Sequence, residues 1–145
     1  MITGLGHLAF RISDLEKSLH FYCETLGFRE AFRLDKEGEP SPWIVYIQVA
    51  PNQFIELFPG AQGENPPRGH ARGYNHVCLV VDDMHATLRE LATRGLAITG
   101  SPLQGVDHNW QYWITDPDGN AIELMQIVAE SPHAAADARW KQPSR

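Results

Sequence analysis

The sequence predicts an α+β protein built from two copies of one module, each running strand, helix and then three strands. Three observations support this class. Residues 6–14 and 75–83 each contain a His, an apolar run after it and an Asp seven positions further on. A helical pattern that closes on a glycine follows in both halves, and both halves end in the tripeptide Ile-Glu-Leu, at 55–57 and 122–124. Such self-similarity indicates two structural repeats.

The first module is expected over residues 1–58. Its opening strand spans 5–12, and Ser13 with Glu16 three positions later has the pattern of a capping box, which predicts a helix over 14–26. Gly27 follows the last helical residue, as glycine commonly does at a helix end. Extended segments near 29–35, 42–50 and 53–58 complete the module. The stretch 59–73, rich in Gly and Pro, is expected to be a linker.

The second module, over 74–128, repeats this order. A strand at 75–81 precedes a helix at 83–94, which ends at Gly95, and strands follow near 97–100, 110–115 and 120–127. The residues Asp-Pro-Asp-Gly at 116–119 predict a tight turn, because proline presets one backbone angle and glycine permits the positive one. Both modules are expected to form one domain over 1–128, and residues 129–145 a C-terminal helix or tail.

Charge and hydropathy exclude two classes of partner. The 145 residues include 12 Lys and Arg against 18 Asp and Glu, for a formal net charge of -6. This balance provides no basic stripe for a phosphate backbone, so nucleic acid is not an expected partner. No apolar run approaches the roughly 20 residues of a membrane span, and the first residues lack the pattern of a signal peptide. A cytoplasmic protein is expected.

Four titratable residues, one His and one Glu from each half, have the same placement on their strands: His7, Glu56, His76 and Glu123. Because side chains alternate across a strand, each of them lies on the face opposite the aliphatic stripe that would pack on a helix. Carboxylates gathered on an inner face would be costly without a compensating cation. Two imidazoles and two carboxylates suit one divalent ion, and zinc, nickel, cobalt, iron and manganese all fit. Alternatively, these are ordinary polar strand residues and no metal is held.

Two aromatic groups are candidates for binding a substrate. Phe54 and Phe58 have the parity of Glu56 and are expected to line the same cavity. His108 and Trp110 lie in a segment that is dense in aromatic and polar residues, a composition common in ligand pockets. The alternative is that rings of this segment belong to the core.

At these residues the sequence resembles the vicinal oxygen chelate superfamily, which contains glyoxalase I, bleomycin-resistance proteins and extradiol dioxygenases. The resemblance covers residues 5–127. It rests on the opening 6–8, the helix 14–19 with Phe21-Tyr22 and 26–28 after it, and the close 116–120 leading into 122–124. It implies a U-shaped, eight-stranded mixed sheet around a metal cavity, and a homodimer is expected.

The resemblance is closest to glyoxalase I, whose four ligands fall on His7, Glu56, His76 and Glu123. It implies a metal-dependent lyase or isomerase that acts on a small vicinal-oxygen substrate through an enediolate-like intermediate. Glu123 would act as base, Glu56 would return the proton, and Arg11 would meet a substrate carboxylate such as that of glutathione. Gly60 and the segment 105–110 depart from the glutathione-binding pattern. Two alternatives remain open: an iron-dependent dioxygenase, and a drug-binding resistance protein without catalysis.

Overall fold

The computed structural model describes residues 2, 4–65 and 72–141. The chain divides into two compact units, one comprising Met1–Pro67 with Asp116–Gly119 and the other Arg68–Thr115 with Asn120–Arg145. The expected linker at 59–73 lies partly outside the described residues, which do not include 66–71. None of the helices among the described residues is long and apolar enough to pass through a bilayer.

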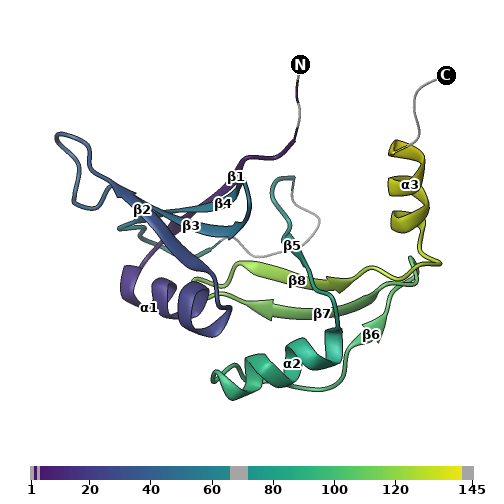
Figure 1. Cartoon of the computed structure of the whole chain (residues 1–145). Helices are drawn as coiled ribbons and strands as arrows, with labels where there is room; N and C mark the ends of the chain where they lie inside the picture. The colour runs from purple at the N-terminus through teal and green to yellow at the C-terminus, as the bar shows by residue number, and fades with distance from the viewer. Residues whose placement is uncertain (1, 3, 66–71, 142–145) are drawn as a thin grey trace. The chain divides into compact units, whose positions relative to one another are not determined.

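The first unit is a four-stranded mixed sheet with one helical segment between its first and second strands (Figure 1). The strands are ordered β1-β4-β3-β2, with β1 parallel to β4 and the other pairs antiparallel. Its elements are β1 His7–Ile12, α1 Leu15–Leu19, the π-helical segment η1 His20–Thr25, β2 Arg29–Leu34, β3 Ile44–Ala50 and β4 Gln53–Pro59.

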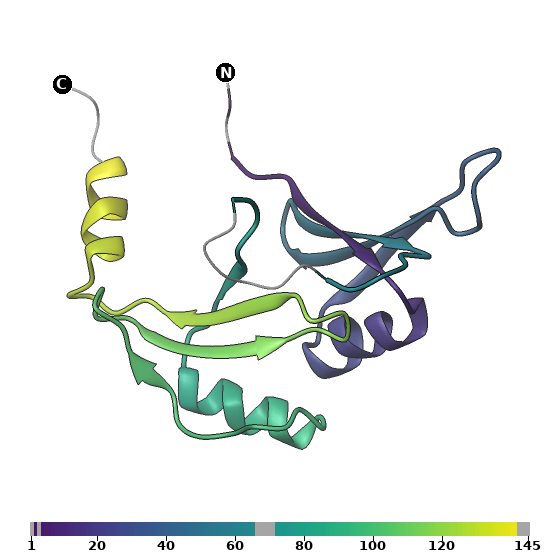
Figure 2. The same cartoon turned by 180° about the vertical axis from the view of Figure 1, so that it is seen from behind.

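The second unit repeats this topology, with strand order β5-β8-β7-β6 and β5 parallel to β8. Figure 2 shows α2 running along β7 and β8, and α3 extending from the end of β8. The elements are β5 Val77–Val80, α2 Met84–Thr93, β6 Leu103–Gln104, β7 Trp110–Thr115, β8 Ala121–Gln126 and α3 Pro132–Trp140. The predicted α+β class with two βαβββ modules is confirmed, and the eight strands form two four-stranded sheets.

Each sheet has one apolar face that packs into the core of its unit. In the first unit Ile12, Val45 and Leu57 are fully buried, and Ile122 of the second unit is equally inaccessible. Burying such a side chain contributes about 1.5–3 kcal/mol, so these strands are held mainly by the face turned away from the four titratable residues. The predicted parity of the strands is therefore confirmed, and the opposite faces are left to carry polar groups.

The helix after β1 begins one residue later than the sequence pattern predicts. Asp14, and not Ser13, is the N-cap: its side chain accepts a hydrogen bond from the Lys17 backbone N–H at 3.1 Å. An aspartate accepts this bond as well as a serine does, which is why the pattern alone placed the cap wrongly. The helix also changes to π-helical geometry after Leu19, and Gly27 follows with a positive φ of 78°.

The strand expected near 97–100 is absent from the described structure, and the short β6 at 103–104 takes its place in the sheet. The physical reason is a side chain. The Tyr112 hydroxyl accepts a hydrogen bond from the Thr99 N–H at 2.7 Å and donates one to the Thr99 carbonyl at 3.0 Å. Both backbone groups of Thr99 are thus bonded to Tyr112, so they are not part of a β-ladder.

The C-terminal residues described form a surface helix, one of the two forms expected for them. The α3 helix starts at its N-cap Ser131, whose side chain accepts a hydrogen bond from the Ala134 N–H. The fully buried Asn109 links β7 to the segment that leads into α3. Its side-chain oxygen accepts a hydrogen bond from Val128 N–H at 3.1 Å, and its amide nitrogen lies 2.9 Å from His133 Nδ1.

Candidate metal centre and substrate surface

The first unit places one His and one Glu side by side on the open face of its sheet. His7 is the first residue of β1, and Glu56 lies on the neighbouring β4, where its backbone pairs with Ala9. His7 Nε2 is 3.5 Å from Glu56 Oε1. Glu56 is only 6% exposed, whereas His7 is largely accessible. A buried carboxylate thus lies next to a solvent-accessible imidazole.

The second unit contains the equivalent pair. His76 lies one residue before β5, and its Nε2 is 3.1 Å from Oε2 of Glu123, which is 7% exposed. The side-chain oxygen of Asn75 is 2.7 Å from His76 Nδ1. Because that oxygen only accepts, the contact favours the tautomer with hydrogen on Nδ1 and leaves the lone pair of Nε2 free to bind a metal.

Each carboxylate lies beside an imidazole, and neither forms an ion pair with a Lys or Arg among the described residues. Within that part of the chain, no group of three or more His, Cys, Asp and Glu side chains is arranged to hold a metal ion. Each unit therefore presents two donors, an imidazole nitrogen and a carboxylate oxygen, of the types that first-row divalent ions bind. The donor chemistry of each pair fits the expected divalent metal ion.

The residues opposite the two glutamates differ between the units. In the first, Tyr46 of β3 pairs with Glu56, and its interaction with that carboxylate raises the pKa of the Tyr46 hydroxyl. In the second, Trp113 of β7 pairs with Glu123, but its ring packs edge-on against His76 at 4.8 Å. Burial and the charge of Glu123 raise the pKa of the neighbouring Cys78 to about 12. Sequence reasoning did not identify Tyr46 as a site residue.

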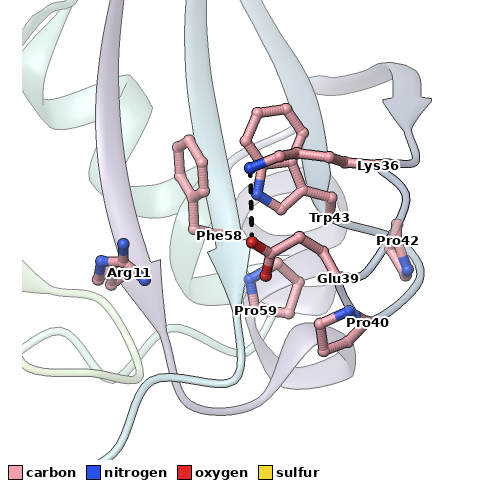
Figure 3. A pocket seen from close by; sticks show the side chains of 8 residues that line it. All are labelled: Arg11, Lys36, Glu39, Pro40, Pro42, Trp43, Phe58 and Pro59. Carbon is pink, nitrogen blue, oxygen red and sulfur yellow. Dashed lines mark hydrogen bonds and ion pairs between the residues drawn. The ribbon is translucent and has the colours of Figure 1, made fainter.

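A pocket of about 220 Å³ lies on the first unit, at the end of β1 and β4 (Figure 3). Arg11 lies beside the Phe58 ring, with its guanidinium carbon 5.8 Å from the ring centroid, and Trp43 meets Phe58 edge-on at 5.9 Å. Across the pocket, Lys36 forms an ion pair with Glu39 at 3.4 Å. Arg11 has no carboxylate partner among the described residues, so the pocket offers one guanidinium between aromatic walls.

The other residues expected to bind substrate are placed differently. Phe54 pairs with His7 and forms an aromatic cluster with Tyr46, so it lies beside the first His–Glu pair. His108 occupies a turn at a positive φ of 69°. Trp110 lies on the face that packs on α2, where its ring meets His85 at 5.8 Å. The open face of β7 instead carries Trp113, which is half exposed.

Sequence comparison assigns the chain and its fold to a class of proteins. Residues 4–124 match the model of the Glyoxalase/Bleomycin resistance protein/Dioxygenase superfamily, and the chain belongs to this family. It is 31% identical over 133 residues to a protein of Synechocystis sp. (strain ATCC 27184 / PCC 6803 / Kazusa) named "Probable lactoylglutathione lyase", an alignment covering 87% of this chain and 97% of that protein.

Two further relatives show the breadth of the family. Catechol-2,3-dioxygenase of Bacillus subtilis (strain 168) is 28% identical over 132 residues, which cover 84% of this chain and 41% of the dioxygenase. A crystal structure of a superfamily member from Sphaerobacter thermophilus DSM 20745 matches with a TM-score of 0.65 and 26% identity, covering 87% of this chain and 98% of the other. These comparisons establish the family, whose members differ in the reaction their names describe, so the reaction of this chain has to be inferred from its site residues.

Proposed function

We propose that this protein is a metal-dependent lyase or isomerase of glyoxalase I type, acting on a small substrate with two neighbouring oxygen atoms. The observation that carries the proposal is the repeated pair: each unit holds a buried glutamate against an imidazole, at equivalent positions of the same sheet topology. Relatives named for lactoylglutathione lyase activity agree with this reading. The chain's membership of a family that contains enzymes does not depend on this proposal.

The proposed ligands of one divalent ion are His7, Glu56, His76 and Glu123. The ion is one of nickel, zinc, cobalt, iron and manganese. When bound, the ion would supply a Lewis acid for negative charge on substrate oxygen. Glu123 is proposed to take a proton from the carbon next to a substrate carbonyl, and Glu56 to return a proton. Their burial supports these roles, because proton transfer is more effective where bulk water is excluded.

The pocket at Arg11 is proposed to receive the part of the substrate remote from the chemistry. Arg11 lies on the same strand face as His7, and Phe58 on the same strand face as Glu56, so the pocket continues the surface of the first His–Glu pair. A guanidinium without a carboxylate partner suits a carboxylate on the ligand, and the rings of Trp43 and Phe58 suit an apolar segment. Glutathione adducts remain one candidate class.

The test begins with metal-free protein, reconstituted without oxygen with each of the five ions in turn. Turnover of 2-oxoaldehydes would then be measured with and without glutathione. Glu123→Gln should lower kcat by about 10²–10⁴-fold, the usual contribution of a general base. Its cobalt affinity should fall much less, and Glu130→Gln, at an exposed glutamate, is the control and should match wild type in both measurements.

Two other functions predict different results. An iron-dependent dioxygenase, a reading favoured by the Bacillus relative, would require Fe(II) and O₂ and would tolerate Glu56→Gln. A drug-binding protein without catalysis would hold no metal tightly, and its ligand affinity would be unchanged in both glutamine variants. Anaerobic turnover with nickel or cobalt would contradict both alternatives. A homodimer, also proposed, is checked by sedimentation of the same preparations.

A further inference from the structure

The size and walls of the pocket at the end of β1 and β4 limit what it can hold. Its volume is about 220 Å³, and most of its lining residues carry an aromatic or proline ring: Pro40, Pro42, Trp43, Phe58 and Pro59. A protein cavity of about 150 Å³ holds one benzene molecule. The pocket therefore has room for a single six-membered ring with a small substituent, but only for one end of a tripeptide such as glutathione.

Arg11 supplies the uncompensated charge of this pocket. Its guanidinium carbon lies 5.8 Å from the centroid of the Phe58 ring. Within the part of the chain that the structure describes, Arg11 forms no ion pair with an Asp or Glu side chain. A guanidinium binds a carboxylate through two parallel hydrogen bonds, and Phe58 offers a ring for a flat ligand to pack against. Together they suit an anion that carries a ring.

The second cation of the pocket already has a partner. The ammonium group of Lys36 lies 4.7 Å from the centroid of the Trp43 ring and 3.4 Å from Oε1 of Glu39 (Figure 3). Trp43 attracts the ammonium through a cation–π contact, and Glu39 cancels its charge. A second carboxylate on a ligand would approach Glu39 as well as Lys36, and Glu39 would repel it. The loop between β2 and β3 thus leaves the pocket with one net positive charge.

We propose that this pocket selects compact ligands with one ring and one negative charge, the class of aromatic monocarboxylates, and that Glu39 sets this charge selectivity by pairing with Lys36. As a statement about the substrate, the inference rests on the proposed function. Phe58 lies two residues beyond Glu56 on the same face of β4, about 7 Å along a strand. A ring in the pocket would therefore carry the two neighbouring oxygen atoms on a short side chain that reaches towards the first His–Glu pair.

The first test compares benzoate with benzamide, its neutral analogue of similar shape, in NMR titrations. Metal-free protein is used, so that benzoate has no metal ion to coordinate. Wild type should bind benzoate about 10-fold or more tightly than benzamide, and Arg11→Gln should lose this preference while keeping the thermal midpoint of wild type. Equal affinities for the two compounds, or a preference that survives in Arg11→Gln, would overturn the ligand class.

The role of Glu39 is tested with the three benzenedicarboxylates, which add a second carboxylate to the same ring. Wild type should bind each of them more weakly than benzoate. In Glu39→Gln the affinity of the best isomer relative to benzoate should rise about 3–5-fold, because Lys36 is then uncompensated. The matched control is Glu37→Gln, at an exposed glutamate of the same loop that does not line the pocket, and it should change this ratio less than about twofold. Equal rises in both variants would overturn the role of Glu39.

Cobalt affinity of the wild-type protein separates this inference from the proposed function. Protein that binds cobalt but does not prefer benzoate over benzamide would overturn the inference and leave the proposed function intact. Protein that prefers benzoate but binds no cobalt would overturn the proposed function, and the selectivity of the pocket would stand without it.

Discussion

Replacing Asn109 by alanine should destabilise the protein more than any exposed substitution, although Asn109 belongs to neither His–Glu pair. Its fully buried side chain donates to Asp107 Oδ2 at 2.8 Å, contacts His133 Nδ1 at 2.9 Å and accepts from Val128 N–H at 3.1 Å. Three hydrogen bonds at about 0.5–1.5 kcal/mol each give a loss of roughly 2–4 kcal/mol. The thermal midpoint of a chain this size should drop by about 5–15 °C.

Thermal unfolding followed by circular dichroism measures this loss, with His133→Ala as the matched control. That substitution removes one of the three contacts from a half-exposed ring, so its effect should be about a third as large. A loss below about 0.5 kcal/mol for Asn109→Ala, the range of ordinary surface substitutions, would refute the assignment of Asn109 as the anchor of α3.

The pH dependence of the Asn109 variant has a definite sign. The hydrogen bond from Asn109 is the main cause that lowers the pKa of Asp107 below its usual 3.8. A lowered pKa in the folded state stabilises the protein above the unfolded value, and this contribution is lost as the pH falls through the folded value. The difference in stability between wild type and Asn109→Ala should therefore be largest above about pH 5 and shrink in stronger acid.

Three further predictions concern the core, the pocket and the first helix. Leu57→Ala, at a fully buried site, should cost about 2–5 kcal/mol in denaturant unfolding, whereas Leu34→Ala at an exposed site should stay within about 0.5 kcal/mol. Arg11→Gln should raise KM for carboxylate-bearing substrates about 10-fold or more without changing metal content, and an unchanged KM would remove Arg11 from the pocket's function. Asp14→Ala should destabilise the protein by about 0.5–2 kcal/mol and Ser13→Ala by less, and the reverse order in thermal melts would restore Ser13 as the cap.

Local periodicity was sufficient to predict the class of fold and the face on which each His and Glu lies. Parity needs only the sequence of a single strand, so His7 and Glu56 could be placed without knowing how the strands pair. Tyr46 could not be found in this way, because its position opposite Glu56 depends on the register of two strands. A bulge between Gln48 and Ala50 shifts that register, and no local pattern in the sequence reports it.

Hydrogen bonding of side chains to the backbone is the second reason why sequence patterns did not predict the structure, as the strand expected near 97–100 shows. The extended segment before β6 has residues compatible with a strand, but the Tyr112 hydroxyl, which lies 13 residues further along the chain, binds Thr99. In the sequence, Asn109 lies between His108 and Trp110, in a segment expected to bind substrate, whereas its burial depends on contacts with residues 16–24 positions away. Long-range contacts of this kind are set by the fold as a whole.

One edge strand of each sheet, β2 in the first and β6 in the second, has features that discourage aggregation. At the edge of the second sheet, β6 has only two residues, and Tyr112 already bonds both backbone groups of Thr99 before it. The edge strand β2 of the first sheet has six exposed residues, but it carries Arg29, Glu30 and Arg33 and contains an irregularity in its pairing. Short or charged edges discourage pairing with strands of another molecule. Substitutions that remove these charges from β2 would therefore affect solubility before they affected folding.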